Sequence, residues 1–315
     1  MIFNTRQKSI LHLLIAIIFI VSVSACKRRG VHETKEPAHI SFKPIANIAY
    51  TEVHRSLKNG LSFDDNGFQT EPGYKITFLT NDSASVYSPD KKAFINFYVF
   101  MEQDSIFNVA RSYFKMQFMS KDSLKFQVLE VDGDTLHTRR SLVYMTFYSN
   151  NFIKTHHLDI VALNKPTRAD TLFIQRKSAI ANKNPDSAFS ARQPVALESR
   201  SPLLTVSRSV EENDPLNPPD ASDFYMDPEF NVTIHKAYED FSYSIAIFVD
   251  DKGKLYFDRS MDYIMPEFRV STTKTLKAII DGYLTAYLKV TPGSTLGIKH
   301  TSYIIVNVVG KKGEK

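Results

Sequence analysis

The chain has 315 residues, which is more than one compact core usually holds, so its length predicts more than one domain. Apolar residues make up 43% and charged residues 23%, a balance that excludes a wholly disordered chain, a collagen and a coiled coil. A formal net charge of +5 gives no indication of nucleic-acid binding, and a single cysteine excludes an internal disulfide framework.

The N-terminus has the pattern of an export signal. Arg6 and Lys8 form a basic start, and residues 10–23 are almost wholly apolar. This apolar stretch is shorter than the roughly 20 residues that a membrane-spanning helix needs. We therefore expect a cleaved signal peptide over residues 1–25, and losing its two basic residues lowers the formal charge from +5 to +3.

The four residues 23–26, Val-Ser-Ala-Cys, resemble the lipobox of bacterial lipoproteins. The resemblance implies cleavage between Ala25 and Cys26, diacylation of the Cys26 thiol, and acylation of the new amino group. Two or more acyl chains are what stable membrane anchoring requires. An ordinary signal peptide with an incidental cysteine and an uncut membrane anchor are the alternatives.

Basic residues follow the cysteine at positions 27–29. In lipoprotein sorting, an acidic residue there would indicate retention in the inner membrane, so this chain is expected on the outer membrane, facing the periplasm. The inner membrane remains an alternative. Residues 26–39 are interpreted as a tether that leads to the first domain.

Residues 40–178 are predicted to form an α+β domain. A helix is expected over residues 106–118, capped by Asp104 or Ser105, because apolar residues there follow one helical face. Runs rich in aromatic and β-branched residues predict strands at 74–80, 93–101, 124–131, 142–148, 158–163 and 171–175.

Half of the chain's 14 prolines fall within residues 179–228, a stretch without hydrophobic periodicity. Such a composition is typical of a semi-extended linker. If it were fully extended it would reach on the order of 150 Å. The alternative is a loop that lies over the two domains.

Residues 229–315 carry the clearest local signals. Strands are expected at 243–249 and 254–258, joined by the turn Asp250 to Gly253. A one-faced amphipathic helix follows over 273–288, and a last strand is expected at 303–309. The whole chain is therefore predicted to be α+β, with two small two-layer α/β-sandwich domains joined by the Pro-rich linker.

The C-terminal residues resemble the C-terminal domain of TonB, the energy transducer. The match rests on the strand and turn at 248–254, the break at Pro292-Gly293 followed by Gly297, and the final strand of tyrosine and alternating aliphatic residues. The resemblance covers about 75 residues (roughly a quarter of the chain) and implies a hairpin–helix–strand fold that binds partners by adding a strand at an open sheet edge.

The last strand is the predicted edge, and its partner-binding residues would be Tyr303, Ile305, Asn307 and Val309. The partners expected are the membrane, through lipid on Cys26, and other envelope proteins, through strand addition. An open edge also permits a homodimer. The alternative is a strand that simply completes the sheet.

No catalytic residue, cofactor or metal ligand is predicted. The nucleophile-elbow, phosphate-loop, zincin and dinucleotide-binding motifs are absent from the sequence. His156 and His157 would point to opposite faces of a strand, and residues 64–66 lack the spacing of a calcium loop.

The leading hypothesis is a non-enzymatic periplasmic lipoprotein that acts as a binding or scaffold protein in the envelope. Two alternatives remain: an energy-transducing transport protein with an uncut inner-membrane anchor, and a ligand-binding or hydrolytic lipoprotein with its site in the first domain.

Overall fold

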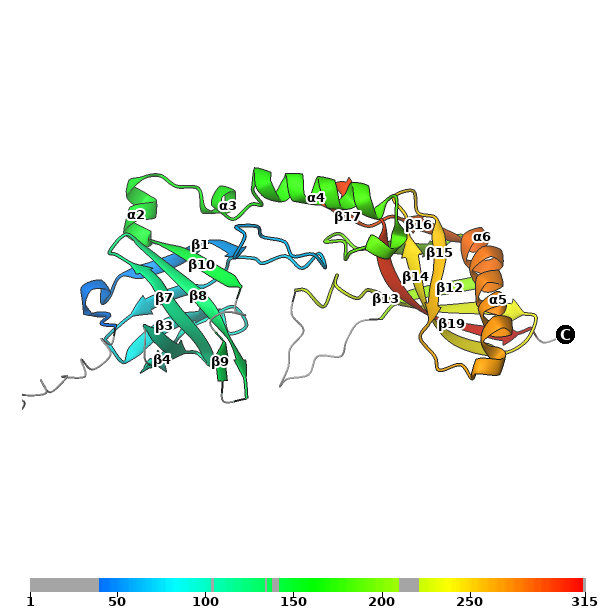
Figure 1. The fold of residues 1–315 in the computed structure, drawn as a ribbon, viewed down its shortest axis with the longest axis horizontal. Coiled ribbons are helices and arrows are strands. Elements are labelled where there is room, and N and C mark those ends of the chain that lie inside the picture. Colours follow the sequence, from blue (N-terminus) through cyan, green and yellow to red (C-terminus); the bar gives the residue numbers. More distant parts are fainter. Residues whose placement is uncertain (1–39, 103–104, 134, 138–141, 210–220, 314–315) are drawn as a thin grey trace, which may run out of the picture.

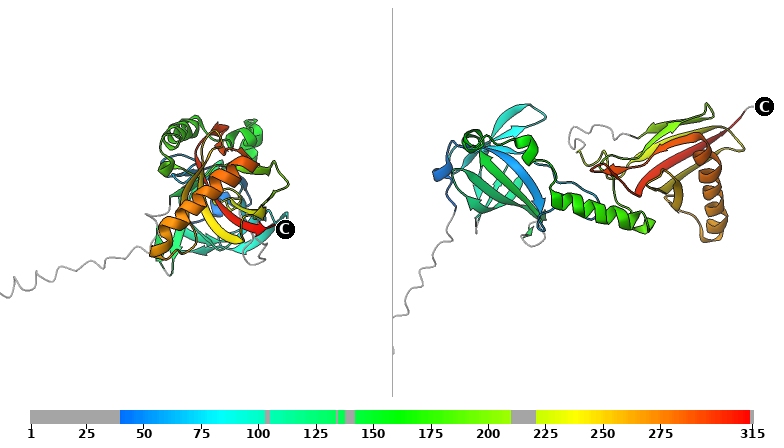
Figure 2. Two further views of the ribbon diagram at one scale, coloured as in Figure 1. Left: turned by 90° about the vertical axis from the view of Figure 1, so that its right-hand side faces the viewer. Right: turned by 90° about the horizontal axis from the view of Figure 1, so that it is seen from above.

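The computed structural model describes residues 40–102, 105–133, 135–137, 142–209 and 221–313. Within them, the chain forms an antiparallel barrel, a bridging segment with a 14-residue helix, and a C-terminal unit built on a five-stranded sheet. Figure 1 shows the barrel at one end of an elongated molecule and the C-terminal sheet at the other, and Figure 2 shows the same separation from above.

The barrel is an antiparallel meander in which successive strands are mostly neighbours. Its order is β4-β3-β2-β1-β10-β8-β7-β6-β5, and the short β9 pairs with β8 outside this path. The strands are β1 (Ala49–Leu57), β2 (Lys75–Phe78), β3 (Ser83–Ser88), β4 (Ala93–Tyr98), β5 (Phe100–Met101), β6 (Ile106–Val109), β7 (Ser112–Met119), β8 (Ser123–Asp132), β9 (Thr135–His137) and β10 (Val143–Ser149).

The barrel closes through one bent segment of chain. β4 and β5 stand at opposite ends of the strand order, yet only Val99 separates them in sequence. β4 pairs with β3, and β5 pairs with β6, so the bend brings the two edges of the sheet together. A nearly closed meander covers most of the exposed edge that an open sheet would leave.

Aromatic rings fill the interior of the barrel. Phe42 directly precedes the 3-10 turn Lys43–Ile45 and stacks on Phe78 with ring centroids 3.8 Å apart. Phe107 contacts the rings of Phe114 and Phe126 at 5.5 and 5.3 Å. All five phenylalanine side chains are almost completely buried, so the barrel has a packed core.

The predicted fold class is wrong. The protein is mostly β, and its first unit is a nearly closed antiparallel barrel, so it is not a pair of two-layer α/β sandwiches. Four predicted strand regions are present, as β2, β4 with β5, β8 and β10. What the sequence pattern missed is that these strands pair in a ring.

The helix predicted over residues 106–118 is also wrong, because this stretch forms the hairpin of β6 and β7. The turn between them uses Ala110 and Arg111, both with positive φ, at 51° and 66°. Two-residue hairpin turns normally carry glycine or asparagine there. Ala110 and Arg111 give no such signal, and the apolar residues fit a period of two as well as a helical face.

Two regions predicted as strands are helices that bridge the barrel and the C-terminal unit. Residues 158–163 contain α3 (Ile160–Leu163), whose N-cap Asp159 accepts hydrogen bonds from Val161 N and Ala162 N. Residues 171–175 lie within α4 (Arg168–Ala181). Thr167 and Asp170 form a capping box at its start, which fixes the helix end despite the β-branched residues inside. The short α2 (Asn150–Thr155) precedes both.

The structure also differs from the predicted linker. Residues 179–209 contain the end of α4, a 3-10 turn (Pro185–Ser187), β11 (Ala196–Ser199) and β12 (Leu204–Arg208). β12 is a strand of the C-terminal sheet and pairs with β13. The prolines here begin turns or precede strands, so their number reflects chain reversals more than extension.

The C-terminal sheet has the order β12-β13-β19-β14-β15. β13 runs parallel to β19, and the other pairs are antiparallel. The remaining strands of this sheet are β13 (Glu229–Ala237), β14 (Phe241–Val249), β15 (Leu255–Ser260) and β19 (Ser302–Lys312). Smaller pairs are formed by β11 with β16 (Leu288–Thr291), and by β17 (Ser294–Thr295) with β18 (Ile298–Lys299).

One continuous helical segment covers one face of this sheet (Figure 2). It starts after the 3-10 turn Pro266–Phe268 and comprises α5 (Arg269–Ile279), a π-helical turn (Ile280–Leu284) and α6 (Thr285–Tyr287). Leu276 and Leu284 are fully buried in one core cluster with Val308 and its neighbours in β19. The predicted hairpin, helix and last strand are therefore present in that order.

A junction of polar and apolar contacts joins the barrel to the rest of the chain. Phe63, in the long loop after β1, is buried in one cluster with Ile174 of α4 and Phe189. The carboxylate of Asp170 accepts a 2.6 Å hydrogen bond from Ser62 N. Arg192 donates to Glu71 at 2.7 Å across the same junction. The loop after β1 is thus tied both to the bridging helix and to the segment that follows it.

Candidate functional site

The predicted lipid-anchor residues, Ala25 and Cys26, lie outside the described residues. The description begins at Ile40. Within the described ranges, no helix combines the length and the apolar character needed to cross a membrane.

The predicted partner-binding strand is not a sheet edge. β19 lies between β13 and β14 and pairs along its length with both. The prediction placed the edge there on the resemblance to the TonB C-terminal domain, which binds partners at an open sheet edge. β13, which had not been predicted, pairs with β19 on the side away from β14, so β19 has no free edge to which a partner strand could add.

The four predicted residues share the sheet face opposite the helices, where each is half-buried. Asn307 donates hydrogen bonds to Glu229 and, at 3.3 Å, to Asn231. Arg259 lies over the ring of Tyr303 at 5.5 Å. Burial raises the pKa of Tyr303, with a smaller opposing effect from Arg259. Tyr303 and Asn307 tie neighbouring strands together, while Ile305 and Val309 complete the apolar part of this face.

The true edges of the described C-terminal sheet are β12 and β15. Among the described strands, β15 pairs only with β14, so the backbone groups on its other side are directed away from the sheet. β15 starts at the tight Asp250 turn that the sequence predicted, where Asp250 Oδ1 accepts from the amides of Lys252 and Lys254. The described sheet therefore has edges at β12 and β15 and none at the predicted strand β19.

A cluster of exposed apolar side chains follows β15 in sequence. Five large side chains within ten residues are between two-fifths and nine-tenths exposed: Met261 (44%), Tyr263 (85%), Met265 (54%), Phe268 (56%) and Val270 (84%). Single exposed apolar residues are ordinary, but several together on one segment mark an interaction site. We call β15 and these five residues the β15 surface.

A pocket of about 400 Å³ lies within the β15 surface, lined by β15, the following loop and the first turn of α5. Its apolar wall includes Phe257 and Ile264, and its rim carries Arg259 and Arg269. Asp262 is held in place because its carboxylate accepts a 2.8 Å hydrogen bond from Ser244 N. An open pocket lined by apolar, polar and charged side chains beside a free strand edge has the geometry to bind an extended peptide.

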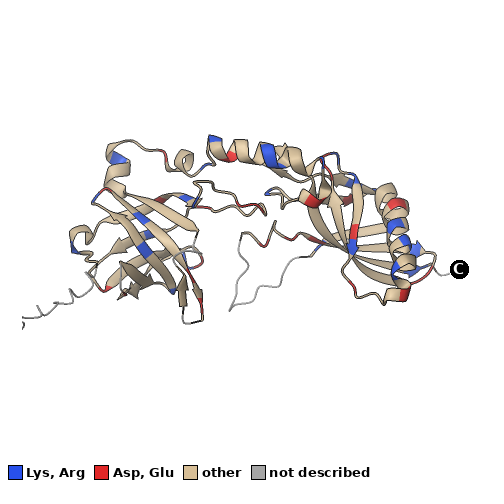
Figure 3. Cartoon of the chain, viewed as in Figure 1, with Lys and Arg blue, Asp and Glu red and all other residues tan. Residues whose placement is uncertain are grey.

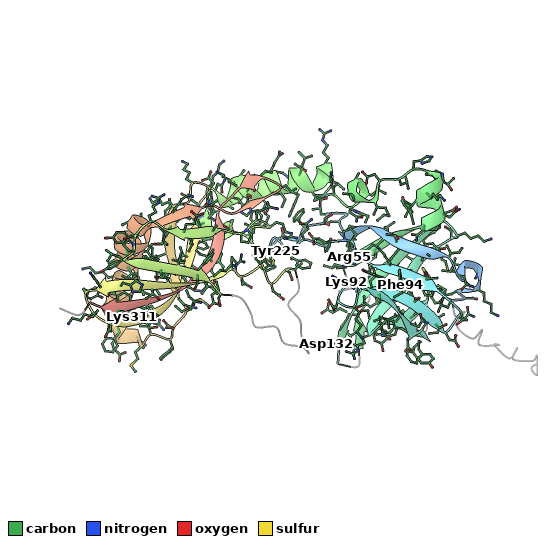
Figure 4. All side chains as sticks on the ribbon, turned by 180° about the vertical axis from the view of Figure 1, so that it is seen from behind. Arg55, Lys92, Phe94, Asp132, Tyr225 and Lys311 are labelled. Carbon is green, nitrogen blue, oxygen red and sulfur yellow. The ribbon has the colours of Figure 1, made fainter. Side chains whose placement is uncertain are left out.

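A second pocket, of about 390 Å³, lies at the junction, between Arg55 of β1 and Tyr225 (Figure 4). Its charged groups are already paired. Arg55 donates two 2.7 Å hydrogen bonds to Glu52, whose buried carboxylate also accepts from Gly73 N and Tyr74 N. Tyr225 Oη accepts from Gln69 N at 2.8 Å. Because these groups hold the junction together, few of their hydrogen-bonding atoms are available to bind a ligand.

The polar clusters noted in the sequence have local structural roles. Asp64 Oδ1 accepts from the amides of Asn66 and Phe68, which makes it a turn residue. His156 follows α2 and packs on Phe152, with ring centroids 4.0 Å apart. Over the part of the chain that the structure describes, no group of three or more His, Cys, Asp or Glu side chains could hold a metal ion.

Comparison with known proteins identifies no relative: no protein-family model matches the chain, and no curated protein matches its sequence. Sequence reasoning missed the β15 surface because apolar character alone does not distinguish side chains that stay exposed from those that form the core.

Proposed function

We propose that this chain is a lipid-anchored protein of the bacterial envelope that binds another envelope protein through the β15 surface. The anchor would be the acylated Cys26 on the periplasmic side of the outer membrane. The single observation that carries the binding role is the cluster of exposed apolar side chains beside the free edge of β15. The protein would act as a binding or scaffold module without chemistry of its own.

Strand addition suits this surface for two physical reasons. A partner strand that pairs with β15 gains main-chain hydrogen bonds along the edge, and its alternate side chains reach the pocket beside that edge. Covering Tyr263 and Val270, each more than four-fifths exposed, also removes apolar area from water. The free strand edge and the exposed apolar side chains both lie in the C-terminal unit, away from the barrel (Figure 1).

The anchor is tested by palmitate labelling in cells that express the full chain. Incorporation that disappears in Cys26→Ala, together with release of the variant from the membrane fraction, supports the proposal. Membrane attachment that survives Cys26→Ala contradicts the lipid anchor and favours the alternative of an uncut inner-membrane segment in an energy-transducing protein.

The binding surface is tested by in-cell crosslinking from a photoreactive residue that replaces Tyr263. The same residue at Phe224, which is 58% exposed and lies outside the β15 surface, is the matched control. A discrete adduct that forms from position 263, and that is lost when Phe268→Ser and Val270→Ser are added, supports the proposal. An adduct of twice the chain's mass would identify a homodimer, and equal labelling from both positions would contradict a specific site.

The alternative of a ligand-binding or hydrolytic lipoprotein has less support. Its site was expected in the first domain, but rings such as Phe107 and Phe126 fill the barrel, and the charged groups of the junction pocket are paired. A site of that kind needs a concave pocket with unpaired polar groups that converge on a ligand.

A further inference from the structure

A row of exposed aromatic side chains runs along the outside of the barrel. Phe94, Tyr98 and Phe100 are 57%, 76% and 61% exposed, and together they form what we call the aromatic row. They lie on one face because side chains alternate along the continuous segment of β4 and β5, which turns Val99 inward to 4% exposure. Figure 4 shows Phe94 and the neighbouring Lys92 on this side of the barrel.

Neighbouring strands extend the row sideways without adding an acidic residue to it. Tyr87 of β3 lies opposite Phe94, with ring centroids 5.3 Å apart, and Lys75 lies over the Tyr87 ring at 5.0 Å. On the other side, Phe100 is paired with Asn108, which is paired with Tyr113. Residues that are paired in this way point to the same face of a sheet.

The row begins beside the point where the N-terminal segment joins the barrel. The amides of Phe42 and Lys43 donate to Asn81 Oδ1 at 2.9 and 3.1 Å. The next residue, Asp82, accepts a 2.8 Å hydrogen bond from Val99 N through its carbonyl oxygen. Val99 separates Tyr98 from Phe100, so the two most exposed rings lie next to the anchored start of the barrel.

The reach of the preceding chain matches this position. Residues 27–39 separate Cys26 from Ile40, the first described residue. A segment of this length spans at most about 45 Å even when fully extended. An acylated Cys26 would therefore keep the barrel within a few tens of ångströms of the bilayer, and the chain enters the barrel next to Tyr98 and Phe100.

We propose that the aromatic row docks the barrel on the bilayer that holds the lipid anchor. Tyrosine is favoured at the level of the lipid headgroups, where its apolar ring and its polar hydroxyl are both accommodated, and the phenylalanine rings add apolar area that leaves water on docking. Asp90 stands beside Lys91 and Lys92, so the turn at the end of the row carries a single net positive charge, and the rings supply most of the attraction. Figure 3 shows few charged residues on the barrel strands.

This inference rests on the proposed anchor but deepens it, because it gives the barrel a function. Docking along β4 and β5 would hold the barrel against the membrane. The β15 surface, which belongs to the C-terminal unit at the other end of the molecule, would stay exposed to the periplasm (Figure 1).

The absence of tryptophan from the chain allows a direct test. Tyr98→Trp and, as control, Tyr263→Trp each introduce a single reporter at a highly exposed position. The acylated mature chain is incorporated into vesicles of phosphatidylethanolamine and phosphatidylglycerol, with and without nitroxide-labelled lipid. We expect the indole emission of Tyr98→Trp to move to shorter wavelength and to be quenched by the labelled lipid, with neither effect in Tyr263→Trp.

Three other results would overturn the docking. The first is emission from position 98 that matches that of the free protein in water, and the second is equal quenching at positions 98 and 263. The third is a blue shift that appears without vesicles and depends on protein concentration, which would show that a second copy of the chain covers the aromatic row. Vesicle flotation of the same samples reports the lipid anchor separately, so a failed anchor and a failed docking surface are distinguishable.

A second measurement uses the mature chain from residue 26 with Cys26→Ser, which removes the acyl chains. Its partitioning onto the same vesicles should fall on the order of tenfold or more in Phe94→Ser/Tyr98→Ser/Phe100→Ser, because three rings lose their burial. The control Tyr263→Ser/Phe268→Ser/Val270→Ser removes apolar groups that are also more than half exposed from the β15 surface. Equal loss in both triple variants would contradict a role for the aromatic row.

Discussion

The imidazole of His300 is stacked on the ring of Phe189, with centroids 3.7 Å apart and planes within 8° of parallel. His300 comes just before β19, and Phe189 follows α4, so the stack joins segments that are distant in sequence. Asn182, at the end of α4, strengthens the same joint by accepting a 2.7 Å hydrogen bond from Thr301 N. The segment that follows α4 is therefore part of the C-terminal unit.

The buried imidazole of His300 predicts that the free energy of unfolding decreases as the pH is lowered. Burial lowers the pKa of His300 from 6.5 to about 4, and Lys177 lowers it slightly, while the Thr301 carbonyl acts in the opposite direction. The unfolded chain binds a proton at this imidazole more readily than the folded chain does. The contribution of His300 to stability is therefore complete above pH 6.5 and is lost as the pH falls toward 4. The loss is about 1.4 kcal/mol per pH unit, or about 3 kcal/mol over the window.

We would measure the loss of stability by denaturant unfolding of the wild type and of His300→Phe. Each protein is unfolded at about pH 7.5 and at about pH 4.5, which lie on either side of the ordinary histidine pKa. The variant keeps a ring to stack on Phe189 but cannot titrate, so its stability should change less between the two pH values. Carboxylates titrate in both proteins, and the difference between the two slopes isolates His300. Parallel slopes would show that His300 is not the source of the acid sensitivity.

The same joint predicts where the C-terminal unit can be cut. A fragment of residues 184–315 keeps β11, β12 and the Phe189 stack, whereas residues 229–315 lack them. Leu197 and Leu204, both buried in the C-terminal core, would be missing from the shorter fragment. Losing two such side chains costs several kcal/mol, at roughly 2–5 kcal/mol each.

Thermal unfolding followed by circular dichroism compares the two fragments. We expect a cooperative transition for residues 184–315 and a lower or absent one for residues 229–315. Equal midpoints would mean that β11 and β12 do not belong to the folding unit.

The C-terminal elements could be predicted because their signals are local. The stripe that includes Leu276, Ile280 and Leu284 identifies a helix from its own sequence, and Asp250 to Gly253 identifies a turn. Closure of the barrel has no such signal. It depends on the pairing of β10 with β1 and on the bend at Val99, and short alternating strands look the same in an open sheet.

The candidate site shows the same division between local and long-range information. The resemblance implied an open sheet edge, but which strand occupies an edge depends on β13, whose pairing with β19 joins segments far apart in the sequence. The exposure of Tyr263 and Val270 could not be read from their apolar character, because the same residue types form the core elsewhere.

The packed interior of the barrel predicts a large difference between two phenylalanines. Phe107 is fully buried and contacts the rings of Phe42, Phe78, Phe114 and Phe126. Phe107→Ala should lower the free energy of unfolding by about 3–5 kcal/mol through lost burial and a cavity. Phe94→Ala, on the outer face, should change it by no more than about 0.5 kcal/mol.

Urea unfolding of the full chain in the absence of lipid measures both changes. The matched substitution at Phe94 removes the same atoms, so the difference reports burial. A loss at Phe94 as large as that at Phe107 would mean that the aromatic row is covered in the free protein, which would also contradict membrane docking.

The junction between the barrel and the C-terminal unit depends on a close approach at Gly67. Its φ is +92°, and a Cβ there would lie 2.3 Å from the carbonyl oxygen of Ser190. The carbonyl oxygen of Asn66 accepts a 2.9 Å hydrogen bond from Ser190 N at the same point. Gly60, in the same loop, also has a positive φ, of +81°, but has no atom within 4 Å of such a Cβ.

Alanine substitutions at Gly60 and Gly67 distinguish the cost of backbone strain from the cost of steric contact. Gly60→Ala should cost about 1 kcal/mol, which is the effect of the left-handed conformation alone. Gly67→Ala has the same strain and must also displace the backbone of Ser190, so its loss should be clearly larger. Hydrogen exchange at the Ser190 amide should accelerate in Gly67→Ala and stay unchanged in Gly60→Ala, because only the first substitution breaks the hydrogen bond to Asn66. Equal stability losses with unchanged exchange would mean that the close approach at Gly67 does not hold the junction together.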